Sequence, residues 1–70
     1  MYRDDKIRSR QAELNWSNDV FAKQAELNIN TVTALRRGEA VSLQTLKKAA
    51  NALGLTMPEL FEPKPEVVGA

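Results

Sequence analysis

The sequence predicts a compact all-α domain of five short helices, followed by an extended C-terminal tail. Three observations lead to this prediction. The 70 residues suffice for one domain at most, and 43% of them are apolar, which is enough for one small core. No alternating β-branched run is present, so no core sheet is expected. Four helix starts share one arrangement of a polar N-cap between two apolar residues.

The first helix is expected over about Asp5–Leu14. Asp4 or Asp5 suits its N-cap, because a carboxylate accepts free backbone N–H groups and favours the positive end of the helix dipole. Ile7 and Leu14 lie two turns apart and predict the face that packs against the rest of the domain.

The next four helix starts follow one pattern. The expected N-caps are Ser17, Asn28, Ser42 and Thr56. An apolar residue precedes each N-cap and another follows it four positions later, which is the spacing of a hydrophobic staple. The four pairs are Trp16–Phe21, Leu27–Val32, Val41–Leu46 and Leu55–Leu60. Thr56 and Glu59 also fit a capping box, in which each side chain accepts a backbone N–H of the other residue.

The helix ends are marked by glycine and proline. Gly38 and Gly54 are expected to end the third and fourth helices, because a left-handed glycine commonly follows the last helical residue. The fourth helix carries an apolar stripe of Leu43, Leu46, Ala50 and Leu53. The fifth helix is short, Met57–Phe61, and the following prolines end it. Residues 1–62 are therefore predicted to fold, and residues 63–70 to form an extended or disordered tail.

The composition argues against catalysis and metal binding. The chain has no cysteine and no histidine, which removes the usual zinc sites, the Ser-His and Cys-His pairs and the commonest general base. A site made of carboxylates alone needs a cleft, and a chain this short has little room for one. We therefore expect no enzyme activity, no metal and no cofactor.

Membrane and export signals are not expected either. No apolar run approaches the length of a membrane span, and the first ten residues do not form a secretory signal. The cytoplasm is the expected location.

The second and third helices form the most informative pair. Residues 17–25 and 28–37 are separated by little more than Glu26-Leu27, which is the spacing of a helix-turn-helix. Ala22 is small where two closely crossing helices leave no room for a larger side chain. The expected inward-facing residues are Phe21, Ala22, Ala25, Leu27, Val32 and Leu35.

From about Ile7 to Phe61, the chain resembles the lambda-repressor-like, Cro/C1-type (XRE-like) helix-turn-helix family. The matching features are Ser17, the Phe21-Ala22 pair, Val32, Leu35, Gly38, Ser42, the Leu43–Leu46 pair and the Ala52-Leu53-Gly54-Leu55 run. The resemblance implies a five-helix fold that binds double-stranded DNA, usually as a dimer. It also implies a regulator of transcription, here expected to be a repressor, at the nucleoid.

The resemblance places helix 28–37 in the major groove, with its outer face toward the bases. By the family pattern the base-contacting residues are Ile29, Asn30, Thr33, Ala34 and Arg37. Asn30 is the strongest candidate, because an Asn amide pairs with adenine through two hydrogen bonds. Ile29 and Ala34 suit thymine methyls, Thr33 a base or a phosphate, and Arg37 a guanine or a phosphate. The set predicts an A·T-leaning half-site.

Six residues are expected to contact phosphates and hold the domain in register. They are Ser17, Asn18, Arg10, Arg36, Ser42 and Gln44. Ser17 and Asn18 lie at one helix N-terminus and Ser42 and Gln44 at another, where free N–H groups favour an anion. Arg8 and Arg10 are expected to add positive charge near the DNA backbone.

The chain departs from the family pattern in three places. Many members have glycine where Glu26 stands, and Glu at a positive φ costs about a kcal/mol. Many members pair an Arg on the first helix with a Glu near the end of the recognition helix, whereas here those places hold Gln11 and Arg36. Arg36 then either hydrogen-bonds Gln11 or contacts a phosphate. Glu39 lies in a loop that often approaches phosphate.

Two further expectations concern partners. The net charge of only +1, with Glu26 and Glu39, leaves open a second interpretation, a protein-interaction module on the same fold. Such an antitoxin-like or anti-regulator protein would bind DNA weakly. A homodimer through the C-terminal region is also expected, because this end is more apolar than a small monomer needs. The residues concerned are Met57, Leu60, Phe61, Val67 and Val68.

Overall fold

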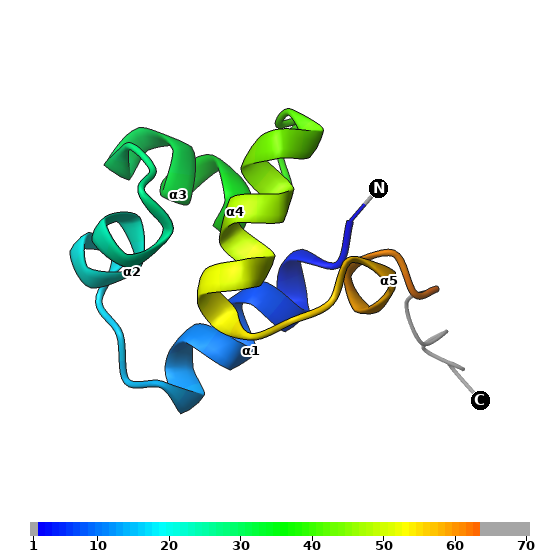
Figure 1. The fold of residues 1–70 in the computed structure, drawn as a ribbon, viewed down its shortest axis with the longest axis horizontal. Coiled ribbons are helices and arrows are strands. Elements are labelled where there is room, and N and C mark those ends of the chain that lie inside the picture. Colours follow the sequence, from blue (N-terminus) through cyan, green and yellow to red (C-terminus); the bar gives the residue numbers. More distant parts are fainter. Residues whose placement is uncertain (1, 64–70) are drawn as a thin grey trace.

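Five α-helices follow one another in the computed structural model, which describes residues 2–63 (Figure 1). The helices are α1 (Asp4–Glu13), α2 (Asn18–Ala25), α3 (Ile29–Arg36), α4 (Leu43–Leu53) and α5 (Met57–Leu60). No strand occurs in residues 2–63, so the all-α prediction is confirmed for this part of the chain. None of these helices is long and apolar enough to cross a membrane. Apart from its first residue, the predicted tail of residues 63–70 lies outside the described residues.

Four of the five predicted helix starts are confirmed. The N-caps of α2, α3, α4 and α5 are Ser17, Asn28, Ser42 and Thr56. Each side chain accepts a hydrogen bond from a backbone N–H in the first turn, and the capping box of Thr56 and Glu59 is complete. These starts were predictable because a cap depends on residues that are neighbours in the sequence.

The start of α1 differs from the prediction. Its N-cap is Arg3, without a side-chain capping bond, and Asp4 and Asp5 lie in the first turn of the helix. The backbone N–H of Arg3 donates to the Leu60 carbonyl over 2.6 Å. The buried Arg3 guanidinium also donates to both carboxylate oxygens of Asp5, over 2.8 and 2.7 Å. Contacts with α5 and Asp5, rather than a local cap, therefore fix where the chain enters α1.

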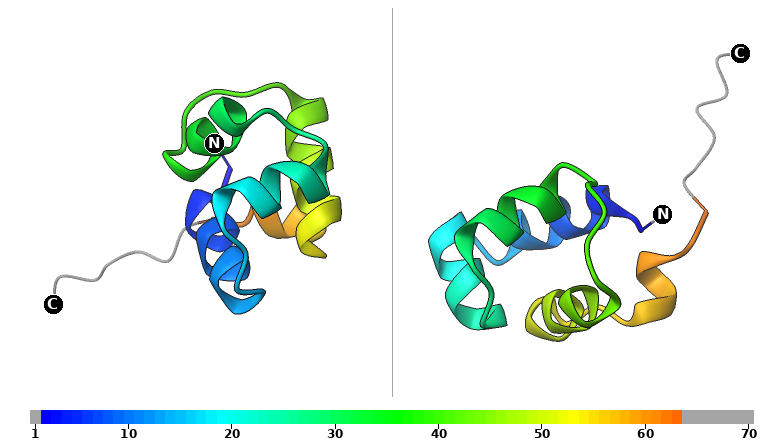
Figure 2. Two further views of the ribbon diagram at one scale, coloured as in Figure 1. Left: turned by 90° about the vertical axis from the view of Figure 1, so that its left-hand side faces the viewer. Right: turned by 90° about the horizontal axis from the view of Figure 1, so that it is seen from above.

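The core lies between the helix-turn-helix and the pair formed by α1 and α4 (Figures 1 and 2). Its largest fully buried side chains are Phe21, Ile7, Leu35, Leu53, Leu60 and Val32. The predicted staple of Trp16 and Phe21 forms, with ring centroids 6.3 Å apart. All five helices contribute to this core, so the site-bearing α2 and α3 are held by packing on α1 and α4.

The predicted apolar stripe of α4 is right except at its first residue. Leu46, Ala50 and Leu53 are buried, and Ala49 joins them. Leu43 is 55% exposed. At about 100° per residue it lies at the edge of the stripe, and it also begins the helix, so the rest of the core does not reach it.

Candidate nucleic-acid interface

The α2–α3 pair is joined by a tight left-handed turn. Glu26 follows α2 with φ 56° and ψ 44°, which is the left-handed conformation. Glycine adopts this conformation most easily, and many family members have glycine at this position. The N–H of Leu27 then donates to the Ala22 carbonyl over 2.8 Å, which closes the end of α2. Asn28 caps α3 directly afterwards, so the two helices lie against each other at one end of the molecule (Figure 1).

The outer face of α3 carries most of the predicted base contacts. Val32 and Leu35 are fully buried and define its inner face. A step of about 100° per residue puts Asn30 and Arg37 on the opposite side of the helix from Val32 and Leu35. Thr33 lies on the flank between this outer side and the inner face. Asn30 and Arg37 are exposed, whereas Thr33 and Ala34 are half-buried. Ile29 is 40% exposed and lies at the side of the helix rather than at the centre of the outer face.

The polar groups on this face differ in what they offer a ligand. The Thr33 hydroxyl donates to the Ile29 carbonyl over 3.1 Å, so its oxygen remains as an acceptor. Arg37 Nη1 lies 3.8 Å from Glu39 Oε2, and the Arg37 side chain is 71% exposed. An exposed pair at this distance is weak. Arg37 therefore retains most of its donors for another acceptor.

Two helix N-termini expose the other predicted polar contacts. Ser17 and Asn18 are exposed at the start of α2, and Ser42 and Gln44 at the start of α4. The two serine oxygens accept the N–H groups of Val20 and Thr45, both over 3.2 Å. The earlier N–H groups of each helix have no intrahelical acceptor and favour an anion.

Arg36 points into the protein. Its Nη1 donates over 2.7 Å to Oε1 of Gln11, a residue that is only 3% exposed. The Gln11 Nε2 in turn donates to Asn18 Oδ1 over 2.9 Å and to the Trp16 carbonyl over 3.1 Å. Of the two roles that the sequence left open for Arg36, the structure shows the hydrogen bond to Gln11.

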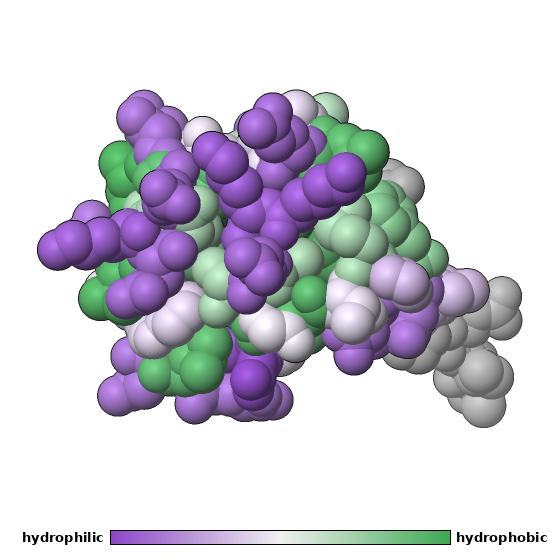
Figure 3. Space-filling view, viewed as in Figure 1, coloured by the Kyte–Doolittle hydropathy of each residue, from purple (hydrophilic) through white to green (hydrophobic). Residues whose placement is uncertain are grey.

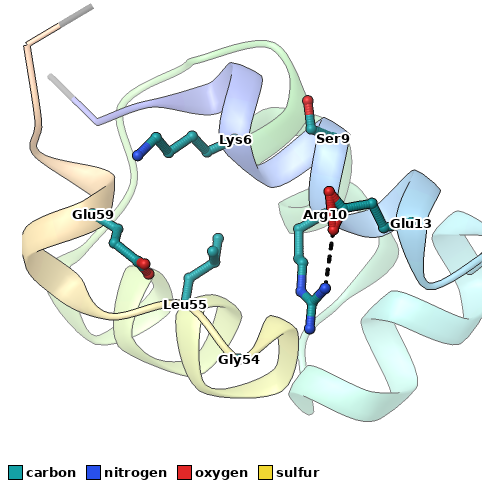
Figure 4. Close-up of a pocket in the computed structure, with 7 residues that line it drawn as sticks. All are labelled: Lys6, Ser9, Arg10, Glu13, Gly54, Leu55 and Glu59. Atoms are coloured by element: carbon teal, nitrogen blue, oxygen red, sulfur yellow. Dashed lines mark hydrogen bonds and ion pairs between the residues drawn. The ribbon is translucent and has the colours of Figure 1, made fainter.

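Arg10 lies away from α3, contrary to its expected role beside the DNA backbone. Its Nε donates to the Leu53 carbonyl over 2.8 Å, and its Nη1 pairs with Glu13 over 3.0 Å. It lines an open surface pocket between α1 and the region of α4 and α5 (Figure 4). The lining residues are Lys6, Ser9, Arg10, Glu13, Gly54, Leu55 and Glu59, and none belongs to α3.

This pocket is built mainly from groups with structural partners. Lys6 pairs with Glu62 over 2.5 Å, and the Glu59 carboxylate accepts the N–H of Thr56 over 2.7 Å. That hydrogen bond holds the pKa of Glu59 below its ordinary value. Cations and carboxylates are both present around the pocket, so it does not present a field of one sign.

Sequence reasoning missed the residues that hold the C-terminal end of α3. The hydroxyl of the buried Tyr2 lies 2.7 Å from the Glu39 carbonyl, the nearest acceptor for its one proton, and 3.2 Å from the Leu35 carbonyl. Arg8 Nη1 donates to the Arg36 carbonyl over 2.6 Å. The Arg36 carbonyl ends α3 and the Glu39 carbonyl lies beyond the helix, so neither has an intrahelical partner, and Arg8 and Tyr2 supply donors that water would otherwise provide. No local pattern around Tyr2 signals such a contact.

Hydrophilic and apolar residues are distributed unevenly over the surface of the domain. In the view of Figure 1, hydrophilic residues crowd the surface over α2, α3 and α4, while apolar residues take a larger share toward α5 (Figure 3). The acidic residues Glu26 and Glu39 are exposed in the turns at either end of α3. They offset part of the positive charge of Arg37 on the same side of the domain.

Comparison with known proteins adds one finding. The family model of the Cro/C1-type HTH DNA-binding domain matches residues 6–66 of the chain. The match contains α2 to α5 and all but the first two residues of α1. No curated protein and no solved structure gives a significant match.

Proposed function

The chain belongs to the Cro/C1-type helix-turn-helix DNA-binding family, and from this premise we propose that it is a sequence-specific transcriptional regulator. It binds double-stranded DNA with α3 in the major groove. Repression is the mode that needs least beyond the bound domain, because occupying an operator is enough to exclude other proteins. Such a regulator acts at the nucleoid, in the cytoplasm.

One observation carries this proposal: the polar outer face of α3 is available to a duplex. Asn30 and Arg37 are exposed directly opposite the fully buried Val32 and Leu35. A major groove admits one α-helix, and a helix anchored on its inner face presents the opposite side to the base edges.

The side chains on α3 suggest distinct roles. Asn30 pairs with adenine through its amide, and Arg37 donates to guanine or to a phosphate. Ile29 and Ala34 lie beside the polar positions and suit thymine methyl groups. The hydroxyl oxygen of Thr33 accepts a hydrogen bond, because its proton is already donated to the Ile29 carbonyl.

We assign the phosphate contacts to two helix N-termini. Ser17 and Asn18 begin α2, and Ser42 and Gln44 begin α4, all exposed. We do not include Arg10 and Arg36 among the proposed phosphate contacts. Arg10 is bound to Leu53 and Glu13 beside a separate pocket, and Arg36 is bound to Gln11.

The proposed homodimer also changes in detail. Leu60 is fully buried in the core of its own chain, so it is not available to a partner. Phe61 is 47% exposed and Met57 half-buried, while Val67 and Val68 lie outside the described residues. We propose that Phe61 is the central contact of a symmetric dimer that reads two half-sites about one helical turn apart. Sedimentation of Phe61→Asp tests this: a monomer is expected where the native chain dimerises.

Selection of duplexes from a random pool, followed by affinity measurements, tests the DNA-binding function. Asn30→Ala is expected to weaken binding to the selected site by about ten- to hundredfold while non-specific binding stays nearly unchanged. Affinity should fall linearly with the logarithm of salt concentration. If no duplex of any sequence shifts the amide NMR spectrum of the protein, the proposal fails.

A protein-interaction module with weak DNA binding is the second candidate. It is favoured by the 55% exposed Leu43 at the start of α4 and by the exposed Glu26 and Glu39 beside α3. For such a protein, Leu43→Ser would abolish capture of a protein partner, and Asn30→Ala would not matter. The regulator proposal predicts the reverse dependence.

A further inference from the structure

A short series of hydrogen bonds joins the end of α3 to the beginning of α2 through Gln11. Arg36 donates to Gln11 Oε1 over 2.7 Å, and Gln11 Nε2 donates to Asn18 Oδ1 over 2.9 Å. Gln11 is 3% exposed, whereas Asn18 is exposed. We call Arg36, Gln11 and Asn18 the amide relay. It runs from the Arg36 guanidinium through the buried Gln11 amide to the Asn18 side chain on the proposed DNA-binding surface.

The chemistry of Arg36 sets the direction of the relay. A guanidinium group has donors and no acceptor, so Gln11 must turn its oxygen toward Arg36. The Gln11 amide nitrogen then faces the other way and requires acceptors. Asn18 supplies one with its Oδ1, and the Trp16 carbonyl, which can only accept, supplies the other over 3.1 Å. Both ends of Gln11 therefore impose the same orientation.

The consequence appears at the surface. With Oδ1 of Asn18 directed inward, its Nδ2 and two N–H donors are left for a ligand. Within residues 2–63, this nitrogen makes no hydrogen bond. An exposed Asn without such a constraint can present either its oxygen or its nitrogen, and only the nitrogen suits a phosphate. The relay thus selects the form of Asn18 that attracts an anion.

We propose that Gln11 and Arg36 are positioning residues that turn the donors of Asn18 toward a DNA phosphate. This inference rests on the proposed DNA-binding function and adds residues that do not touch DNA themselves. It also gives Arg36 a role in DNA affinity that differs from the direct phosphate contact expected from the sequence. Reversing the donor at position 36 should reverse the relay.

Side-chain amide NMR of the free protein tests the orientation without DNA. The Gln11 Nε2 protons are expected to exchange slowly with solvent and the Asn18 Nδ2 protons quickly. In Arg36→Glu, which offers only acceptors, the new carboxylate competes with the Trp16 carbonyl for the Gln11 nitrogen, and the amide turns over where the carboxylate takes it. Asn18 should then donate to Gln11 Oε1, and its Nδ2 protons should become protected. Protected Asn18 protons in the native protein would overturn the relay.

Duplex affinity tests the consequence for binding. Arg36→Glu is expected to weaken binding about tenfold more than Lys48→Glu, which makes the same charge change on the exposed face of α4. In Gln11→Glu both side-chain oxygens are acceptors, so Asn18 should again turn its nitrogen inward and the affinity for the duplex should fall. The new carboxylate still accepts the hydrogen bond of Arg36. Thermal melting of each variant establishes that it is folded.

A second substitution provides a rescue. Adding Gln11→Arg to Arg36→Glu restores donors toward both the introduced carboxylate and Asn18 Oδ1. Affinity should then recover most of the tenfold loss. Equal weakening by Arg36→Glu and Lys48→Glu, or no recovery in the double variant, would overturn the positioning role. If the native protein has the expected amide exchange and binds no duplex, the relay stands and the proposed function fails.

Discussion

The hydroxyl of Tyr2 lies 2.7 Å from the carbonyl oxygen of Glu39, a residue 37 positions later in the chain. The same hydroxyl lies 3.2 Å from the Leu35 carbonyl at the end of α3. One phenol thus connects the segment before α1 to the end of α3 and to the loop that follows it. The position of α3 depends on this residue as well as on its own apolar face.

Tyr2→Phe should lower the free energy of unfolding by about 1 kcal/mol, because the partly buried hydrogen bond to the Glu39 carbonyl is lost while the ring remains. Urea denaturation of the two proteins measures the difference. The loss should be largest near the end of α3, where amide exchange of Gly38 and Glu39 reports local opening. An unchanged midpoint would show that water replaces the hydroxyl without cost.

The same hydroxyl predicts a response to alkali. Burial raises the pKa of Tyr2, and the nearby Asp4 and Glu39 charges act in the same direction. A group with a raised folded pKa stabilises the protein below its unfolded pKa of 10.0, and this contribution is lost as the pH rises through the folded pKa. The stability difference between the native chain and Tyr2→Phe should therefore shrink above pH 10. A constant difference would argue against burial of the phenol.

Asp5 should make the domain sensitive to acid. Its hydrogen bonds with the Arg3 guanidinium hold the pKa of Asp5 far below its ordinary value of 3.8. A depressed folded pKa adds stability above the unfolded value, and this is lost as the pH falls below about 3.8 toward the folded pKa. Asp5→Asn should be less stable at neutral pH, and its deficit should narrow on acidification. Thermal melts across that range measure both proteins, and parallel curves would contradict the role of Asp5.

The accuracy of the sequence predictions followed the distance between interacting residues. Ser17, Asn28 and Ser42 cap helices through residues two or three positions away, so their pattern was readable. Arg36 and Arg10 are bound 25 and 43 positions away, to Gln11 and Leu53. For Arg36 the sequence left two partners open, Gln11 and a phosphate, and for Arg10 it did not indicate the Leu53 carbonyl.

The sequence separation of interacting residues also decides which parts of the candidate site were predictable. The outer face of α3 was predictable because helical periodicity fixes which residues oppose Val32 and Leu35. The start of α1 was not, since the Arg3 N–H is fixed by the Leu60 carbonyl from the other end of the domain. The amide relay has the same origin, because Gln11 meets Arg36 only after three helices have packed.

The left-handed Glu26 offers a way to stabilise the domain. A side chain at φ 56° is strained, and glycine relieves this strain. Glu26→Gly should raise the free energy of unfolding by about 1 kcal/mol. Glu26→Ala is the matched control, because it removes the charge but keeps the Cβ, and it should not stabilise. Equal gains in urea denaturation would assign the effect to charge instead of backbone strain.

Glu39 should limit DNA affinity. It is exposed in the loop after α3, and its carboxylate lies 3.8 Å from the Arg37 guanidinium, which the proposed function directs toward DNA. Glu39→Gln removes a charge that repels phosphates and competes for Arg37, so affinity should rise roughly two- to fivefold at low salt. The gain should shrink as salt screens the interaction. Glu13→Gln, beside the pocket on α1, makes the same charge change away from α3 and should have a smaller effect. Equal gains from both variants in anisotropy titrations would mean that net charge, and not the pairing with Arg37, governs binding.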